Sequence, residues 1–256
     1  MNCINFNQFI EFHQGNIPLI LSIPHGGDLK NTEIPDRVNG ILGTDSKTIE
    51  LGKELITMIE KYKQGSNKLI ITPSYVISLI HRSKIDLNRE EFEAFNPKSD
   101  IAKLIYDFYH QKLKEIILYN LKTFNSSFLI DIHGFESDKR PEGYRDVDLI
   151  LGSNNLGTLY TSPIPKKDWG KSMRGKIVKA FNKDGILIAP GHHLRKEYVL
   201  TGGYITTKYG ASSISRSQSM QIEFSDRVRI FDNFLRKIVL SRLVQILYDD
   251  YLFKYI

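Results

Sequence analysis

The chain has 256 residues, of which 41% are hydrophobic and 25% are charged, and its formal net charge is +6. This balance is typical of a folded globular protein and excludes a largely disordered chain. No apolar run approaches the roughly 20 residues that span a bilayer. The amino-terminal residues lack the basic and apolar stretches of a secretory signal, and the single Cys3 excludes an internal disulfide bond. We therefore expect one domain over residues 1–256, located in the cytoplasm and without a membrane partner, and the sequence makes no prediction about oligomeric state.

The basic residues are dispersed along the chain. A nucleic-acid-binding protein normally concentrates Lys and Arg on one face or one element, whereas no block of five basic residues occurs here. We therefore expect no nucleic-acid partner. The mild positive charge would equally suit a small anionic substrate.

Short apolar strands alternate with amphipathic helices along the chain. Helices are predicted at 45–63, 99–122 (with Ser99 as N-cap) and 231–251, and strands at 18–23, 68–72, 76–80, 127–132, 147–151, 186–189 and 220–224. Strands that are apolar on both faces are typical of a sheet covered by helices on both sides. The predicted fold class is therefore α/β, with a central mixed, mostly parallel sheet flanked by helices.

Three polar motifs fall at the ends of predicted strands. His25 follows the first strand in the run PHGGD, His133 lies in the run DIHG, and Glu223 lies in the strand QIEF. Ligands of such sheets bind at the carboxyl ends of the strands. We therefore expect these three residues to share one active site.

The two histidine motifs indicate a metal site. His25 and Asp28 at short spacing, completed by the distant His133, form the ligand set of a catalytic zinc site that leaves a position for water. Asp131, two residues before His133, could orient that ligand. The alternative is that each histidine is a hydrogen-bonded turn residue, but their joint placement at strand ends before glycines favours the metal.

Other residues are typical of an enzyme that acts on an anion. Arg82 and Arg89, with Asn88 beside the second, could bind a carboxylate, although Asp86 and Glu90 could pair with the arginines and make the cluster structural. Glu223 in a dry pocket would have a raised pKa and could serve as general base, unless it lies on an exposed strand face.

One more segment, LTGGYIT at 200–206, contains adjacent glycines. Gly203, followed by Tyr204, permits a tight turn or a close approach of substrate to the backbone. We therefore count Gly203 and Tyr204 among the candidate substrate-binding residues.

Taken in order, the runs PHGG, HRSKIDLNR, DIHG, LTGGYITTKYG and QIEF, with Asp45 leading a helix after the first, resemble the N-formylglutamate amidohydrolase family. The resemblance runs from about residue 22 to residue 223. It implies a single catalytic domain of the phosphorylase/hydrolase-like fold found in zinc carboxypeptidases.

The resemblance also implies roles for the residues. His25 and His133 would bind one Zn²⁺ or another divalent metal, with either Asp28 or Asp45 as the carboxylate ligand. Arg82 would stabilise the oxyanion, and Glu223 would activate a zinc-bound water and protonate the leaving amine.

Further roles concern the substrate. Asn88 and Arg89 would hold the carboxylate of a small N-acyl amino acid or peptide. The implied reaction converts N-formyl-L-glutamate to formate and L-glutamate. A carboxypeptidase or another N-acyl amino acid deacylase on the same scaffold is the enzymatic alternative, and a non-catalytic anion-binding module is the alternative outside enzymes.

Overall fold

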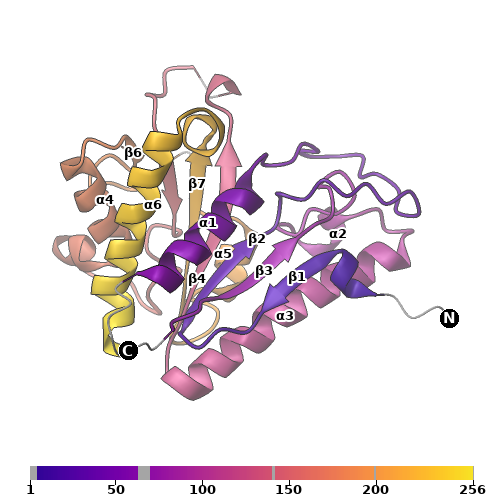
Figure 1. Cartoon of the computed structure of the whole chain (residues 1–256), viewed down its shortest axis with the longest axis horizontal. Coiled ribbons are helices and arrows are strands. Elements are labelled where there is room, and N and C mark those ends of the chain that lie inside the picture. The colour runs from indigo at the N-terminus through magenta and orange to yellow at the C-terminus, as the bar shows by residue number, and fades with distance from the viewer. Residues whose placement is uncertain (1–4, 63–69, 140–141, 199, 256) are drawn as a thin grey trace.

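A seven-stranded sheet forms the centre of the protein, whose computed structural model describes residues 5–62, 70–139, 142–198 and 200–255 (Figure 1). The strand order is β1-β3-β2-β4-β7-β5-β6. The β1–β3 and β5–β7 pairs are antiparallel, and the other four neighbouring pairs are parallel. The predicted α/β fold with a mixed, mostly parallel sheet is therefore confirmed.

The strands lie close to their predicted positions, with one exception. Their bounds are β1 Ile10–His13, β2 Leu19–Ile23, β3 Ser74–Ser78, β4 Ser127–Phe135, β5 Leu149–Gly152, β6 Ile188–Ala189 and β7 Ser217–Ser225. The strand predicted at 68–72 is wrong over residues 70–72, which belong to no strand, while residues 68 and 69 lie outside the described residues. Pro73 has no N–H to donate to a ladder, and β3 begins directly after it. Sequence patterning also missed the edge strand β1.

The helices are α1 Thr48–Lys61, α2 Glu91–Ala94, α3 Asp100–Phe124, α4 Met173–Lys183, α5 Tyr204–Tyr209 and α6 Asn233–Leu247. Ser99 is the N-cap of α3 as predicted, because its side chain accepts a hydrogen bond from Ala102 N–H. The predicted last helix is divided in the structure. A π-helical turn, Arg227–Phe231, precedes α6, and a second one follows it. No helix in the described parts of the chain is long and apolar enough to cross a membrane.

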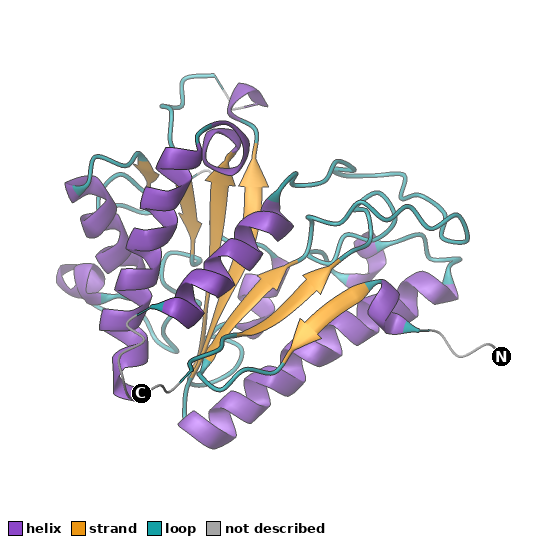
Figure 2. Ribbon diagram, in the orientation of Figure 1, coloured by secondary structure: helices purple, strands orange, loops and turns teal. Residues whose placement is uncertain are grey.

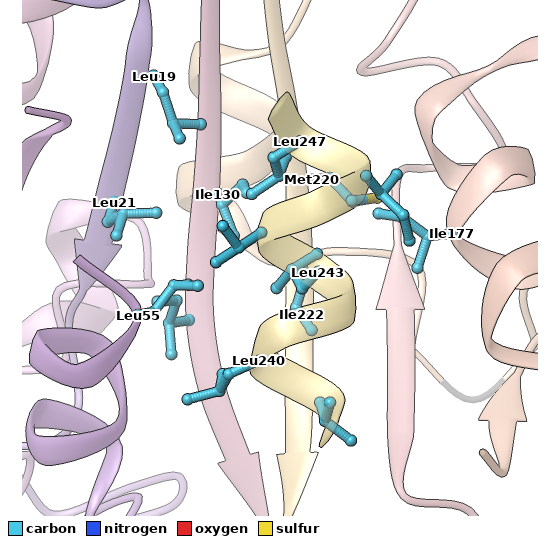
Figure 3. Close-up of a cluster of buried hydrophobic side chains, with 14 of the residues drawn as sticks. Leu19, Leu21, Leu55, Ile130, Ile177, Met220, Ile222, Leu240, Leu243 and Leu247 are labelled. Atoms are coloured by element: carbon cyan, nitrogen blue, oxygen red, sulfur yellow. The ribbon is translucent and has the colours of Figure 1, made fainter. Parts of the chain in front are cut away.

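Helices cover both faces of the sheet (Figure 2). On one face, α1, α4 and α6 bury an apolar cluster against alternate residues of β2, β4 and β7, including Leu21, Ile130 and Ile222 (Figure 3). On the other face, α3 and α5 pack on Ile20 and Leu129. Burial of apolar surface on both faces stabilises the sheet and makes it a rigid support for the strand ends.

The face beneath α3 and α5 changes from apolar to polar towards the carboxyl ends of β2, β4 and β7. Register places Ser22 beside Asp131 and Asp131 beside Gln221. Two residues further along these strands, His133 lies beside Glu223. Because residues two apart on a strand share a face, this row of polar side chains forms the floor of one site.

Candidate metal centre and active site

Three side chains converge where β2 and β4 end. His25 Nδ1 and His133 Nδ1 lie 3.1 Å apart. Asp45 Oδ2 lies 3.2 Å from His133 Nδ1 and 3.5 Å from His25 Nδ1. All three residues are buried, and their potential ligand atoms lie within 4.8 Å of one another, so the group could hold a metal ion.

Each of these residues comes from a different segment. His133 lies near the end of β4, and His25 follows β2 by two residues. Asp45 lies in the loop before α1, where its backbone N–H donates to His25 C=O at 3.0 Å. Its carboxylate also accepts a hydrogen bond from Gly134 N–H at 3.2 Å. These backbone contacts fix the loop against the two strand ends.

The outer nitrogen of each histidine has its own carboxylate partner. His25 Nε2 lies 2.6 Å from Asp86 Oδ1, and His133 Nε2 lies 2.9 Å from Asp131 Oδ2. Both carboxylates are fully buried. Each carboxylate therefore favours the tautomer in which its histidine carries a proton on Nε2. In that tautomer the Nδ1 lone pair is free, as in the carboxylate–histidine pairs that support metal sites.

This arrangement fits a cation. Two Nδ1 lone pairs and the Asp45 carboxylate face one another, and three acceptors at this spacing repel unless a positive charge lies between them. Where no cation is bound, a proton can supply this positive charge, and the pKa shifts of His133 and Asp45 reflect that. Burial lowers the pKa of His133, but Asp131 and Asp45 outweigh it and raise that pKa well above its ordinary value. Burial likewise raises the pKa of Asp45, but the two histidines outweigh it and lower that pKa. Two imidazoles and one carboxylate form a donor set suited to zinc.

The structure distinguishes the two carboxylates between which the sequence left the choice open. Asp45 lies in the group of three, whereas Asp28 is exposed and lies outside it. After a bend at His25, Gly27 bridges His81 and Leu29 bridges Ile80, so the backbone around Asp28 runs alongside the segment that follows β3. Proximity in sequence to His25 therefore did not bring the Asp28 carboxylate to the histidines.

Glu223 lies beside His133 in the register of β4 and β7 and is buried. Gln221 Nε2 donates to Glu223 Oε1 at 2.7 Å, and Gly203 N–H donates to Gln221 Oε1 at 2.5 Å. Burial and Asp45 raise the pKa of Glu223, and His133, Gln221 and His25 only partly offset this rise. A carboxylate with a raised pKa next to a metal site is suited to accept a proton from water.

Arg82 is buried between two aspartates. Its Nε donates to Asp86 Oδ2 at 3.0 Å, and its Nη1 lies 3.4 Å from Asp45 Oδ1. Arg37 also approaches Asp86, at 3.5 Å from Oδ2. Burial raises the pKa of Asp86, but His25, Arg82 and Arg37 outweigh it and keep that pKa low. Asp86 therefore remains ionised and links His25 to the arginines.

The remaining candidates divide into two groups. Asn88 reaches the site, with Nδ2 3.2 Å from His133 Nε2 and Oδ1 accepting from Ile205 N–H at 2.8 Å. Arg89 is closer to solvent, with its side chain 44% exposed and Nε 3.7 Å from Asp86 Oδ2. Tyr204 packs against His110, which is not one of the three converging residues, and accepts a hydrogen bond from Lys208.

The LTGGYIT segment has a role that its sequence did not indicate. Backbone N–H groups of Gly203 and Ile205, at the start of α5, bind the amide oxygens of Gln221 and Asn88. This fixes the orientation of both amides, and Gln221 Nε2 is thereby the atom that donates to Glu223. A side chain on residue 203 would collide with Asn88, since a Cβ there would lie 2.2 Å from Nδ2.

Sequence reasoning missed two contributions to the site. Asp86 appeared only as a partner for arginines, and nothing in its surroundings in the sequence indicates the contact with His25. Arg37 gave no signal, because it lies in a loop without periodicity. Its guanidinium donates to the backbone carbonyls of Ile41, Arg82 and Glu93 and also lies 3.5 Å from Asp86 Oδ2.

Asp86 and Asp131, the carboxylates that contact Nε2 of the two histidines, allow a direct test of the candidate metal site. Replacing Asp131 with Asn keeps the side-chain shape but removes the charge that holds the proton on His133 Nε2. We expect zinc affinity to fall by about 10- to 100-fold, as is usual when such a partner is lost. Competition with a chromophoric chelator measures this. Asp138→Asn, at an exposed position near the same strand end, is the control and should bind zinc as the wild type does.

Comparison with known proteins gives the fold. No protein-family model matches the sequence, and no curated protein matches it. Among solved structures, the chain is similar to N-formylglutamate amidohydrolase from Ralstonia eutropha JMP134, with a TM-score of 0.63 and 14% identity, over 97% of this chain and 99% of that one. It is also similar to the gene product Atu2144 from Agrobacterium tumefaciens, with a TM-score of 0.59 and 11% identity, over 94% and 95% of the two chains. The architecture is therefore shared along nearly the whole length.

Proposed function

We propose that the protein is a metal-dependent amidohydrolase that cleaves an amide next to a carboxylate, with N-formyl-L-glutamate as the favoured substrate. The observation that carries this proposal is the convergence of the His25, Asp45 and His133 lone pairs beside the buried Glu223. The fold shared with an N-formylglutamate amidohydrolase supports the substrate class. A cytoplasmic location and a small anionic N-acyl amino acid as partner are parts of the same proposal.

His25, Asp45 and His133 would hold the metal, with zinc the best match to two imidazoles and one carboxylate. Bound there, zinc would act as a Lewis acid on the substrate carbonyl and lower the pKa of water to about 7. Asp86 and Asp131 keep the two imidazoles in the tautomer that this binding needs.

Glu223 would transfer a proton from the attacking water to the leaving amine. Its Oε1 is occupied by Gln221 Nε2, so Oε2 is the atom that would accept a proton from the attacking water. The same oxygen would then deliver that proton to the nitrogen of the leaving amino acid. Because burial raises its pKa, Glu223 takes up a proton more readily than an ordinary carboxylate does.

Arg82 and Arg89 would bind the negatively charged groups of the substrate. Arg82 uses Nε and Nη1 on aspartates, and its guanidinium carries further donors for an oxyanion formed at the carbonyl. Arg89, half-exposed at the edge of the site, would bind the carboxylate of the amino acid.

The test is release of free amine from N-acyl amino acids by the zinc-loaded and the chelator-stripped protein. We expect zinc-dependent hydrolysis of N-formyl-L-glutamate, and weaker hydrolysis of N-acetyl-L-glutamate and N-formyl-L-leucine. Faster hydrolysis of a peptide with a free carboxyl end would favour the carboxypeptidase alternative. No hydrolysis of any of these compounds by zinc-loaded protein would contradict the proposed activity.

A further inference from the structure

Arg229 is a buried cation on the side of the sheet opposite the histidines. It lies in the π-helical turn Arg227–Phe231 after β7, and its side chain is fully buried. A guanidinium in this position is destabilising unless its N–H donors find acceptors. Its Nε donates to Phe224 C=O, and Nη2 donates to Phe135 C=O and Glu136 Oε1, each at 3.0 Å. Its Nη1 donates to Ser46 C=O.

These acceptors belong to the three segments that carry the active site. Ser46 directly follows Asp45, and Phe224 directly follows Glu223. Phe135 follows His133 by two residues. One side chain therefore connects the loop before α1 to the ends of β4 and β7, and three of its four acceptors are backbone carbonyls.

Gly134 leaves the space that the Arg229 side chain occupies. Neighbouring residues on a strand face opposite sides of a sheet, so position 134 faces away from the His133 side chain. A Cβ at Gly134 would lie 2.3 Å from Arg229 Nε, which is closer than any side chain tolerates. The glycine after the histidine in DIHG thus leaves room for the guanidinium, while its own N–H binds the Asp45 carboxylate.

We propose that Arg229 is a positioning residue for the metal centre, resting on the metal site of the proposed function. By binding Ser46 C=O from one side, it holds the Asp45 loop against the strand ends that carry His133 and Glu223. It does not touch the metal ligands themselves. Its loss would let the Asp45 carboxylate move relative to the histidines, and a metal site depends on such spacing.

Cobalt provides the test, because Co²⁺ binds the donors that zinc uses and its visible spectrum reports their geometry. The variants are Arg229→Met, Arg229→Lys and, as matched control, Arg174→Met. Arg174 is also fully buried and ion-paired, at 3.1 Å from Glu197, but its other partners are His193 C=O and Arg195 C=O. Both Met variants remove a buried guanidinium, so both should lower the melting temperature.

We expect Arg229→Met to bind Co²⁺ at least 10-fold more weakly, with a changed visible band. Arg229→Lys, which keeps the charge but not the planar fork, should be intermediate. Arg174→Met should keep the wild-type affinity and spectrum. If Arg229→Met does not fold, the Co²⁺ affinity and visible spectrum of Arg229→Lys alone test the positioning role.

Wild-type affinity and spectrum in the Arg229 variants would overturn the positioning role and leave the proposed function intact. An equal loss of Co²⁺ affinity in Arg174→Met would also overturn it, since the effect would then follow stability alone. A wild-type protein that takes up no Co²⁺ would instead overturn the metal site, and the positioning role with it.

Discussion

Replacing Glu223 with Gln is expected to lower kcat/KM for N-formyl-L-glutamate by about 10²- to 10⁴-fold, the usual contribution of a general base. Glutamine has the shape of glutamate but cannot take a proton from water. The side chain lies beside His133 and is not one of the three candidate metal ligands. Zinc content should therefore remain at the wild-type level, so that the loss falls on the reaction and not on metal binding.

Glu142→Gln is the matched control for this substitution, because Glu142 is exposed and lies outside the site. It should keep wild-type kcat/KM and zinc content. A Glu223→Gln enzyme with wild-type activity would contradict the role of Glu223. Equal loss of zinc and activity would mean that Glu223 acts through the metal site and not as a base.

The pH profile of the wild type gives an independent check on Glu223. Burial is the largest contribution to the pKa of this carboxyl and raises it above its ordinary value. The base must be deprotonated to accept a proton, so kcat/KM should increase as pH increases through that raised pKa. The acid limb of the profile should therefore lie above the pH at which an exposed glutamate titrates.

Replacing Asp45 with Ala should have the second large effect. Asp45 is the carboxylate of the buried group of three, and its loss leaves two histidines to hold the metal. We expect zinc affinity to fall by more than the roughly 10- to 100-fold that follows loss of an outer partner. The measurement is a competition titration, with circular dichroism to show that the variant is folded.

Asp28→Ala is the matched control, since the sequence alone offered Asp28 and Asp45 equally. Asp28 is exposed and outside the group, so its loss should leave zinc affinity unchanged. The reverse pattern, with zinc lost in Asp28→Ala and kept in Asp45→Ala, would show that the carboxylate ligand has been assigned to the wrong residue.

Much of the fold could be predicted from local patterns. Apolar runs such as 127–132 and 220–224 identify buried strands, because both faces of a central strand are covered. Ser99 marks the start of α3 through its capping chemistry. The short edge strand β1, Ile10–His13, could not be found in this way, since only its first residue is fully buried and the apolar pattern is weak.

Local patterns alone predicted the site only where strand ends determine it, and Asp45 entered only through the family resemblance. His133 and Glu223 lie together because parallel neighbouring strands carry them in register, which follows from the fold. Asp45 and Asp86 reach the site, and Arg229 reaches the loop behind it, through loops or turns whose paths no local pattern specifies. For the same reason, the sequence shows that Gly134 follows His133, but it does not show that a glycine is needed there to leave room for Arg229.

The measurement that tests the account most directly is the zinc content of the purified protein, for the wild type and for His133→Ala. His133 contacts Asp45, Asp131 and His25, so replacing it with Ala removes one of the three candidate ligands and its contacts with the other two. We predict about one zinc per chain in the wild type and a large loss in His133→Ala. A wild-type protein that holds no zinc and takes none up on addition, or an equal zinc content in both proteins, would contradict a metal centre at His25, Asp45 and His133.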